Sequence, residues 1–180
     1  MKKIKRIRSS LQKQLSRYSC VYTSKHFFYY NGGYDQGLKK INLYNNPCAR
    51  NPTFSQLISF LKKDKTDLML YVDNSFVCAD FAEKLHNNAE HQGLRCGYAR
   101  VYCTDGSTHT CNAWNTADKG LVFTDSTGID YHSQDPSIDC NDSIAVIHHN
   151  QVYECYSIID KSREFVFGDI GEVQRVLVFW

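Results

Sequence analysis

The sequence predicts an α+β fold, in which helices come first and a run of antiparallel strands follows. Two observations predict this class. Apolar residues recur at helical spacing between Phe54 and Ala89, and from Leu94 onward the hydrophobic period changes to two. At 180 residues, with 42% hydrophobic and 22% charged residues, the chain is long enough for one main domain. The composition excludes a disordered or collagenous protein. No apolar run approaches the roughly 18 residues of a membrane span.

Basic charge is concentrated at the start of the chain. Residues 1–20 hold seven lysines and arginines and no acid, whereas the rest has 14 bases against 19 acids. We therefore expect a basic arm (1–20), an aromatic-rich segment that packs on the core (21–51) and a main domain (52–180). The arm has the charge to contact nucleic acid or an anionic membrane surface, but a solvated tail is the simpler interpretation, and nucleic acid is not the expected partner. The arm lacks the apolar stretch of a signal peptide, which favours a cytoplasmic protein unless an upstream signal was removed.

The first expected helix covers residues 54–63. Thr53 followed by Gln56 has the form of a capping box. The apolar residues that recur at helical spacing after it are Phe54, Leu57, Ile58 and Leu61. Residues 68–72 are apolar and are expected to form a strand or an extended link.

The second expected helix contains a cysteine in its first turn. Asn74 and Ser75 are good capping residues, and Gly93 stands where a helix would end. The apolar residues at steps of four between them are Val77, Phe81, Leu85 and Ala89. Cys78 lies at the start of this segment.

Strands are expected through the rest of the chain. Residues 94–103 and 109–116 flank Asp105-Gly106, a strong two-residue hairpin signal. A third strand is expected at 121–125. The later strands are expected at 143–148 and 152–159, which form a hairpin around His149-Asn150, and at 172–180. The pair His148-His149 is therefore expected in a surface turn.

The eight cysteines form neither a disulfide scaffold nor a recognisable metal motif. They are too sparse for a small disulfide framework, and there is no C-x-x-C. Cys96, Cys103 and Cys111 are spaced by seven and eight residues, which is not zinc-finger spacing. The sequence has no G-x-G-x-x-G and no G-x-x-x-x-G-K-[ST] motif. We therefore expect no metal and no cofactor.

Three residues combine into a possible thiol site. The N-terminus of a helix favours the thiolate of Cys78, although a packed core cysteine is the simpler interpretation. If positions paired between the strands at 109–116 and 121–125 sum to 234, His109 and Asp125 are direct cross-strand neighbours, and the carboxylate can orient the imidazole. His86 lies about 12 Å along the helix from Cys78, too far for a hydrogen bond.

The segments that hold these residues resemble the transglutaminase-like superfamily. The resemblance runs from about Pro52 to Gly128, through Phe76-Val77-Cys78-Ala79-Asp80-Phe81-Ala82, Gly93-Leu94-Arg95-Cys96-Gly97-Tyr98, His109-Thr110-Cys111-Asn112-Ala113-Trp114 and Gly120-Leu121-Val122-Phe123-Thr124-Asp125-Ser126-Thr127-Gly128. It implies a papain-like core, with the nucleophile helix packed on an antiparallel sheet. It also implies a nucleophile (Cys78), a base (His109) and an orienting acid (Asp125).

The resemblance also implies surroundings for this triad. The backbone N–H of Cys78 would help to hold the oxyanion, with Tyr71 and Asn74 as candidates for a second donor. Trp114 and Tyr98 are candidates for the substrate groove. However, many members have tryptophan two residues after the histidine, whereas this chain has Cys111 there, and the odd offset of Trp114 places it on the opposite strand face from His109.

The expected function is thiol-dependent acyl transfer on amides, with a peptide or protein as substrate. Hydrolysis and transamidation are both open, because the sequence does not show whether water or an amine resolves the thioester. The alternative is a catalytically silent module that binds partners through the aromatic segment and the basic arm.

Overall fold

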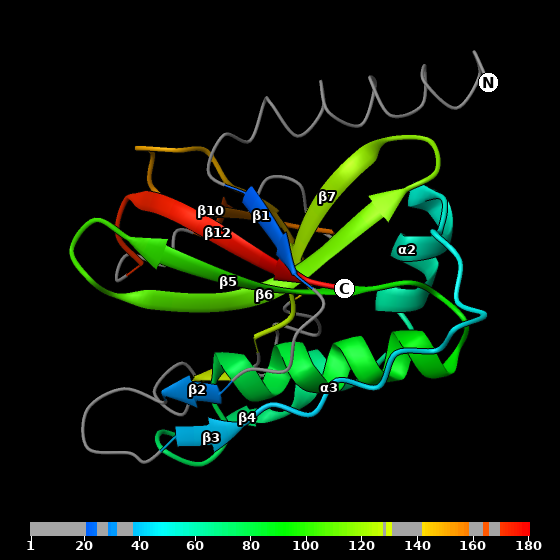
Figure 1. Cartoon of the computed structure of the whole chain (residues 1–180), viewed down its shortest axis with the longest axis horizontal. Helices are drawn as coiled ribbons and strands as arrows, with labels where there is room; N and C mark the ends of the chain where they lie inside the picture. The colour runs from blue at the N-terminus through cyan, green and yellow to red at the C-terminus, as the bar shows by residue number, and fades with distance from the viewer. Residues whose placement is uncertain are drawn as a thin grey trace.

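The fold is α+β, as the sequence predicts (Figure 1). The computed structural model describes residues 21–24, 29–31, 38–127, 129–130, 142–158, 164–165 and 170–180. The basic arm at 1–20 and the link around Pro136 lie outside these residues. Two helices are described, and they lie on one side of the main sheet.

The main sheet has eight strands in the order β1-β12-β5-β6-β7-β9-β10-β11. Neighbours from β12 to β11 are antiparallel, and β1 joins β12 in parallel. Its strands are β1 (Val21–Ser24), β5 (Gly97–Cys103), β6 (Thr108–Thr116), β7 (Gly120–Asp125), β9 (Ser143–Val146), β10 (Glu154–Ser157), β11 (Glu164–Phe165) and β12 (Val173–Phe179). Two further pairs of short strands are β2 (Tyr29–Asn31) with β3 (Leu38–Lys40), and β4 (Leu70–Tyr71) with β8 (Ile129–Asp130).

The first described helix, α2 (Phe54–Leu61), begins with the predicted capping box. Thr53 Oγ1 accepts a hydrogen bond from the Gln56 N–H, and the Gln56 side chain accepts one from the Thr53 N–H. The helix is two residues shorter than predicted. A short 3₁₀ turn, η1 (Thr66–Leu68), follows it and leads into β4.

The second described helix, α3 (Cys78–His91), starts later than the predicted caps. Its N-cap is Val77, whose backbone N–H donates to the Asp80 carboxylate at 3.0 Å. Asn74 lies instead in a turn, with φ of 69°, where its side chain is exposed. The prediction of Asn74 and Ser75 as caps is therefore wrong. Gly93 has φ of 77° directly after the helix, which is the left-handed C-terminal glycine that the sequence indicates.

The hairpin of β6 and β7 differs in register from the prediction by two residues. Thr116 pairs with Gly120 and Asn112 with Thr124, so paired positions sum to 236 instead of 234. Asp125 consequently lies opposite Cys111, and His109 is its diagonal neighbour on the same face. The prediction of direct opposition is wrong, but a diagonal pair remains within reach of long side chains.

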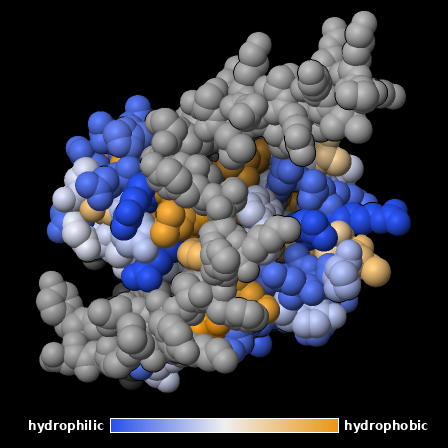
Figure 2. Space-filling model, in the orientation of Figure 1, coloured by the Kyte–Doolittle hydropathy of each residue, from blue (hydrophilic) through white to orange (hydrophobic). Residues whose placement is uncertain are grey.

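The two faces of β6 belong to different cores. Asn112 and Trp114 face the helices, where Asn112 donates to the Ala82 carbonyl at 2.9 Å and Trp114 packs with Leu57 and Leu85. Residues on the other face pack with side chains from β5, β7, β9, β10 and β12, so the sheet curves around this second cluster. Figure 2 shows hydrophobic residues near the centre of the view and hydrophilic ones toward its margins.

Residues 41–50 run along the outer side of α3 (Figure 1). Their main anchor is the buried Glu90 carboxylate, which accepts from the Asn46 N–H at 3.0 Å and from the Cys96 N–H at 2.8 Å. The Tyr44 ring stacks on His91 at a centroid distance of 4.1 Å. Within the described residues, no helix is both long and apolar enough to cross a bilayer.

Candidate functional site

The candidate nucleophile, Cys78, is the first residue of α3. Its backbone N–H and the positive end of the helix dipole therefore lie beside its own thiol. The side chain is buried, with 6% of its surface exposed, and it forms a hydrogen bond with His109.

The histidine and the aspartate are joined by a short hydrogen bond. His109 Nε2 lies 2.6 Å from Asp125 Oδ2, and both residues are buried. Because Nε2 is directed at the carboxylate, Nδ1 is the ring nitrogen that remains for the Cys78 thiol. The structure thus brings the three residues together in the order thiol, imidazole, carboxylate.

The contact between Cys78 and His109 joins the two sides of the sheet. His109 shares a face with Cys111, away from the helices, yet Cys78 comes from α3. In the described ladder, β6 pairs with β7 only from Asn112 onward. His109 therefore precedes the first described pair of β6 with β7.

Asp125 is held by two residues that the sequence analysis missed. Oδ1 accepts from the Thr127 N–H at 2.9 Å and from Thr127 Oγ1 at 2.6 Å, and Oδ2 accepts from the Tyr153 hydroxyl at 2.8 Å. An aspartate with a threonine two residues later is a recognisable turn motif, so Thr127 could have been found from the sequence. Tyr153 immediately precedes β10, on a separate part of the sheet, and no local signal marks it.

The charges of the pair support each other. Burial alone would lower the pKa of His109, but the Asp125 carboxylate and the hydrogen bonds to Asp125 and Cys78 outweigh it and raise that pKa to about 10. Burial alone would raise the pKa of Asp125, but His109 and the Thr127 donors lower it below its usual value. An imidazolium beside a carboxylate is therefore the stable state at neutral pH, which suits a neighbouring thiolate.

The other described cysteines are free thiols and differ from Cys78 in their surroundings. Cys48 is exposed. Burial raises the pKa of the Cys96, Cys111 and Cys155 thiols well above the ordinary value. Among the residues that the structure describes, no group of three histidine, cysteine or acidic side chains could hold a metal ion.

The remaining site candidates lie in different places. Tyr71 is half-buried and stacks in parallel on Phe81, whereas the Asn74 side chain is exposed. Trp114 and Tyr98 are completely buried in the layer between sheet and helices, and Trp114 donates to Thr124 Oγ1 at 2.8 Å. A side chain without exposed surface cannot line an open groove, so the structure corrects the placement of both residues.

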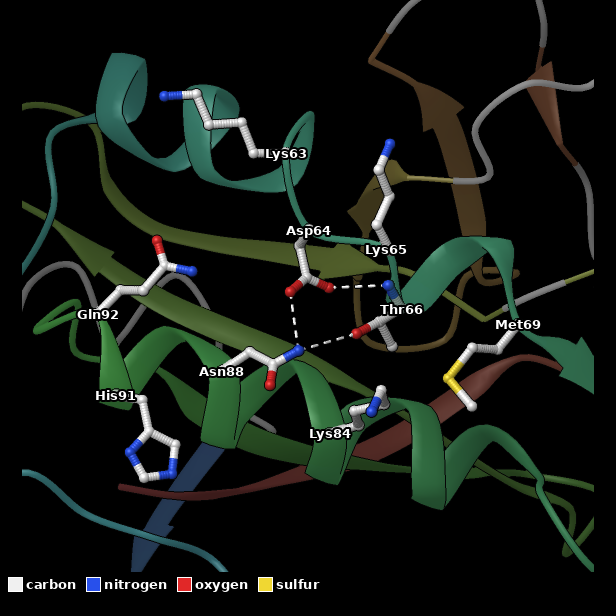
Figure 3. A pocket seen from close by; sticks show the side chains of 9 residues that line it. All are labelled: Lys63, Asp64, Lys65, Thr66, Met69, Lys84, Asn88, His91 and Gln92. Carbon is white, nitrogen blue, oxygen red and sulfur yellow. Dashed lines mark hydrogen bonds between the residues drawn. The ribbon is translucent and has the colours of Figure 1, made fainter.

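A separate hollow of about 600 Å³ lies between η1 and the outer side of α3 (Figure 3). Its lysines are Lys63, Lys65 and Lys84. Its single carboxylate, Asp64, accepts from the Thr66 N–H at 2.9 Å and from Asn88 Nδ2 at 2.8 Å. None of the three triad residues lines this hollow.

Comparisons with known proteins found no relative of this chain. No family model matches it, and no curated protein or solved structure matches it significantly.

Proposed function

We propose that this protein catalyses acyl transfer on amides through Cys78, His109 and Asp125. The observation that supports it best is the buried hydrogen-bonded series of these three side chains, with the thiol at a helix N-terminus. The same residue types in the same order make nucleophile, base and orienting acid in thiol hydrolases.

In the proposed reaction, the Cys78 thiolate attacks the carbonyl carbon of an amide, and the oxyanion forms beside the Cys78 N–H. His109 gives its proton to the leaving amine as the C–N bond breaks, which leaves a thioester on Cys78. Water, or an acceptor amine, then attacks the thioester carbonyl carbon and gives a proton to His109, and the C–S bond breaks. The products are the carboxylic acid, or a new amide, and the regenerated Cys78 thiolate beside the His109 imidazolium.

We further propose that the fold is transglutaminase-like, with a papain-like arrangement of its core. The packing of α3 on β6 and β5 supports this, because it sets a cysteine at the helix N-terminus against a histidine on an antiparallel sheet. A peptide or protein is the substrate class we propose. The burial of the site requires the substrate carbonyl to enter by a narrow approach.

The experiment that tests this proposal compares two thiols of opposite exposure. Cys48 is exposed and Cys78 is 6% exposed, so a reagent governed by access modifies Cys48 first. We expect a peptide-based thiol-reactive probe to modify Cys78 faster at pH 7, and Cys78→Ala to lose this labelling while Cys48→Ala keeps it. Peptide mapping by mass spectrometry identifies the modified residue. Equal labelling of Cys78→Ala and wild type would show that the nucleophile is assigned wrongly.

A second candidate is a binding module without catalysis. The observation that favours it is the low exposure of both Cys78 and His109. On this reading wild-type Cys78 shows no pH-dependent reactivity near neutrality, and deletion of residues 1–50 abolishes partner binding.

A further inference from the structure

Tyr153 touches two members of the triad at once. Its hydroxyl donates to Asp125 Oδ2 at 2.8 Å, the same oxygen that accepts from His109 Nε2. Its ring meets the His109 ring edge to face, with centroids 5.0 Å apart and planes at 69°. Tyr153 is completely buried. The Tyr153 side chain therefore fixes both the carboxylate oxygen that accepts from the imidazole and the plane of the imidazole ring.

Thr127 supplies the donors to the other oxygen of the carboxylate. Its N–H and hydroxyl both donate to Asp125 Oδ1, at 2.9 and 2.6 Å. These two hydrogen bonds, those from His109 and Tyr153, and a longer one from the Cys155 thiol to Oδ2 at 3.9 Å leave the carboxylate no rotation that preserves them all. A buried carboxylate with this many donors is held in one orientation.

We propose that Tyr153 and Thr127 are positioning residues that fix the Asp125 carboxylate, and through it the His109 ring, for proton exchange with Cys78. This inference rests on the proposed function for its purpose, although the geometry that it concerns does not. Tyr153 holds Oδ2 in line with Nε2 and blocks rotation of the ring, so Nδ1 stays directed at the thiol. Thr127 holds Oδ1 on the opposite side.

The hydrogen-bond donors around Asp125 also compete for the negative charge of its carboxylate. Each N–H or O–H that donates to the carboxylate weakens its hold on the imidazole proton. Loss of the Tyr153 hydroxyl therefore leaves His109 harder to deprotonate. The other titratable groups near His109 and Asp125 in the described residues are the thiols of Cys78, Cys103, Cys111 and Cys155.

The test measures the titration of His109 by NMR in the full chain, together with the pH profile of Cys78 alkylation. In Tyr153→Phe the ring contact remains and only the donor is lost. We expect the His109 titration and the alkaline limb of the alkylation profile to move up by roughly half to one pH unit. Thr127→Val should move both in the same direction, and Thr127→Ser, which keeps the hydroxyl, should restore the wild-type values.

The matched control is Thr116→Val at the other end of the same hairpin. Thr116 is buried, and its hydroxyl donates to the Gly120 carbonyl and accepts from the Lys119 N–H, so its loss also removes buried hydrogen bonds. We expect it to lower stability without moving the His109 titration. Unmoved titrations in both Tyr153→Phe and Thr127→Val, with stability lowered as in the control, would overturn the inference. An unreactive wild-type Cys78 would instead reject the proposed function, since the NMR readout needs no catalysis.

Discussion

The histidines at the middle of α3 and at the start of β6 are both buried, but their rings face different partners. His86 Nδ1 lies 3.1 Å from the neutral Asn87 side-chain oxygen, whereas His109 Nε2 lies 2.6 Å from a carboxylate. Burial lowers the pKa of His86 to about 4, with the Asn87 hydrogen bond opposing it only in part. Asp125 instead reverses the effect of burial at His109 and raises its pKa to about 10.

The comparison shows that burial alone does not decide the charge of a histidine. A neutral amide cannot replace the solvation that an imidazolium loses, while an ionised carboxylate can. Among the described residues, His86 Nε2 is buried without a hydrogen-bond partner, which fits a neutral ring held by packing. The difference supports a packing role for His86 and agrees with the proposed role of His109 in proton transfer.

The largest effect is expected from removing the His109 ring. In His109→Ala, the rate at which a peptide-amide probe acylates Cys78 should fall by about 10²- to 10⁴-fold, because the proton donor to the leaving amine and the positive charge beside the thiolate are both lost. Intact-mass spectrometry over time measures this rate. His86→Gln is the control and should keep the wild-type rate. If both variants react alike, the distinction between the two histidines fails.

The next effect concerns the carboxylate. Asp125→Asn should lower the free energy of unfolding at pH 7 by about 3–5 kcal/mol, because one partner of a buried charge pair is removed. Urea unfolding measures the change, and exposed Asp73→Asn should stay within about 0.5 kcal/mol of wild type. His109 should then titrate below 6.5, as His86 does.

The pH dependence of that stability difference has a definite sign. The pKa of Asp125 is lowered in the folded protein. Its contribution to the free energy of unfolding is therefore present above pH 3.8 and is lost as the pH falls through the pKa of the folded state. The pKa of His109 is raised in the folded protein. Its contribution to the free energy of unfolding is therefore present below pH 6.5 and is lost as the pH rises toward about 10. The advantage of wild type over Asp125→Asn should therefore be greatest between about 4 and 6.5. A maximum above pH 9 would contradict the pairing.

A smaller effect is expected at His86 under acid conditions. Its pKa lies near 4 when folded and 6.5 when unfolded, so protonation favours the unfolded chain as the pH falls through this range. Relative to His86→Gln, wild type should lose about 3 kcal/mol of stability between pH 7 and pH 4. Urea titrations at several pH values measure this. A constant difference between the two proteins would show that His86 is solvated.

The smallest effect is expected at Asn87. Its side-chain oxygen raises the pKa of His86, so Asn87→Ala should lower the His86 titration by less than about one unit. NMR titration measures the shift. A rise in the pKa of His86 in this variant would contradict the role of the Asn87 hydrogen bond.

Local signals predicted the elements well, but not the register between them. The capping box at Thr53, the hairpin at Asp105-Gly106 and the glycine that ends α3 are read from a few adjacent residues. The register of β6 against β7 depends on which residues form the connecting loop. The observed three-residue loop at 117–119 shifts Asp125 by two positions.

Long-range packing explains the site residues that were missed or misplaced. Tyr153 reaches Asp125 from 28 residues away, and no spacing rule links them. The family resemblance predicts Trp114 in a substrate groove, but this residue lies on the helix-facing side of β6 and is completely buried. Cys78, His109 and Asp125 can be predicted because the position in a helix and the face of a strand are local properties. A register shift of two residues leaves His109 and Asp125 on the same face of the sheet.

The burial of three other cysteines also bears on oxidative damage. Peroxides react with thiolates, and the raised pKa values of Cys96, Cys111 and Cys155 keep these sulfurs protonated at neutral pH. Brief peroxide treatment should therefore leave all three as thiols. A protein rich in cysteine would in this way restrict sulfenic acid formation to the few sulfurs that its fold leaves ionisable.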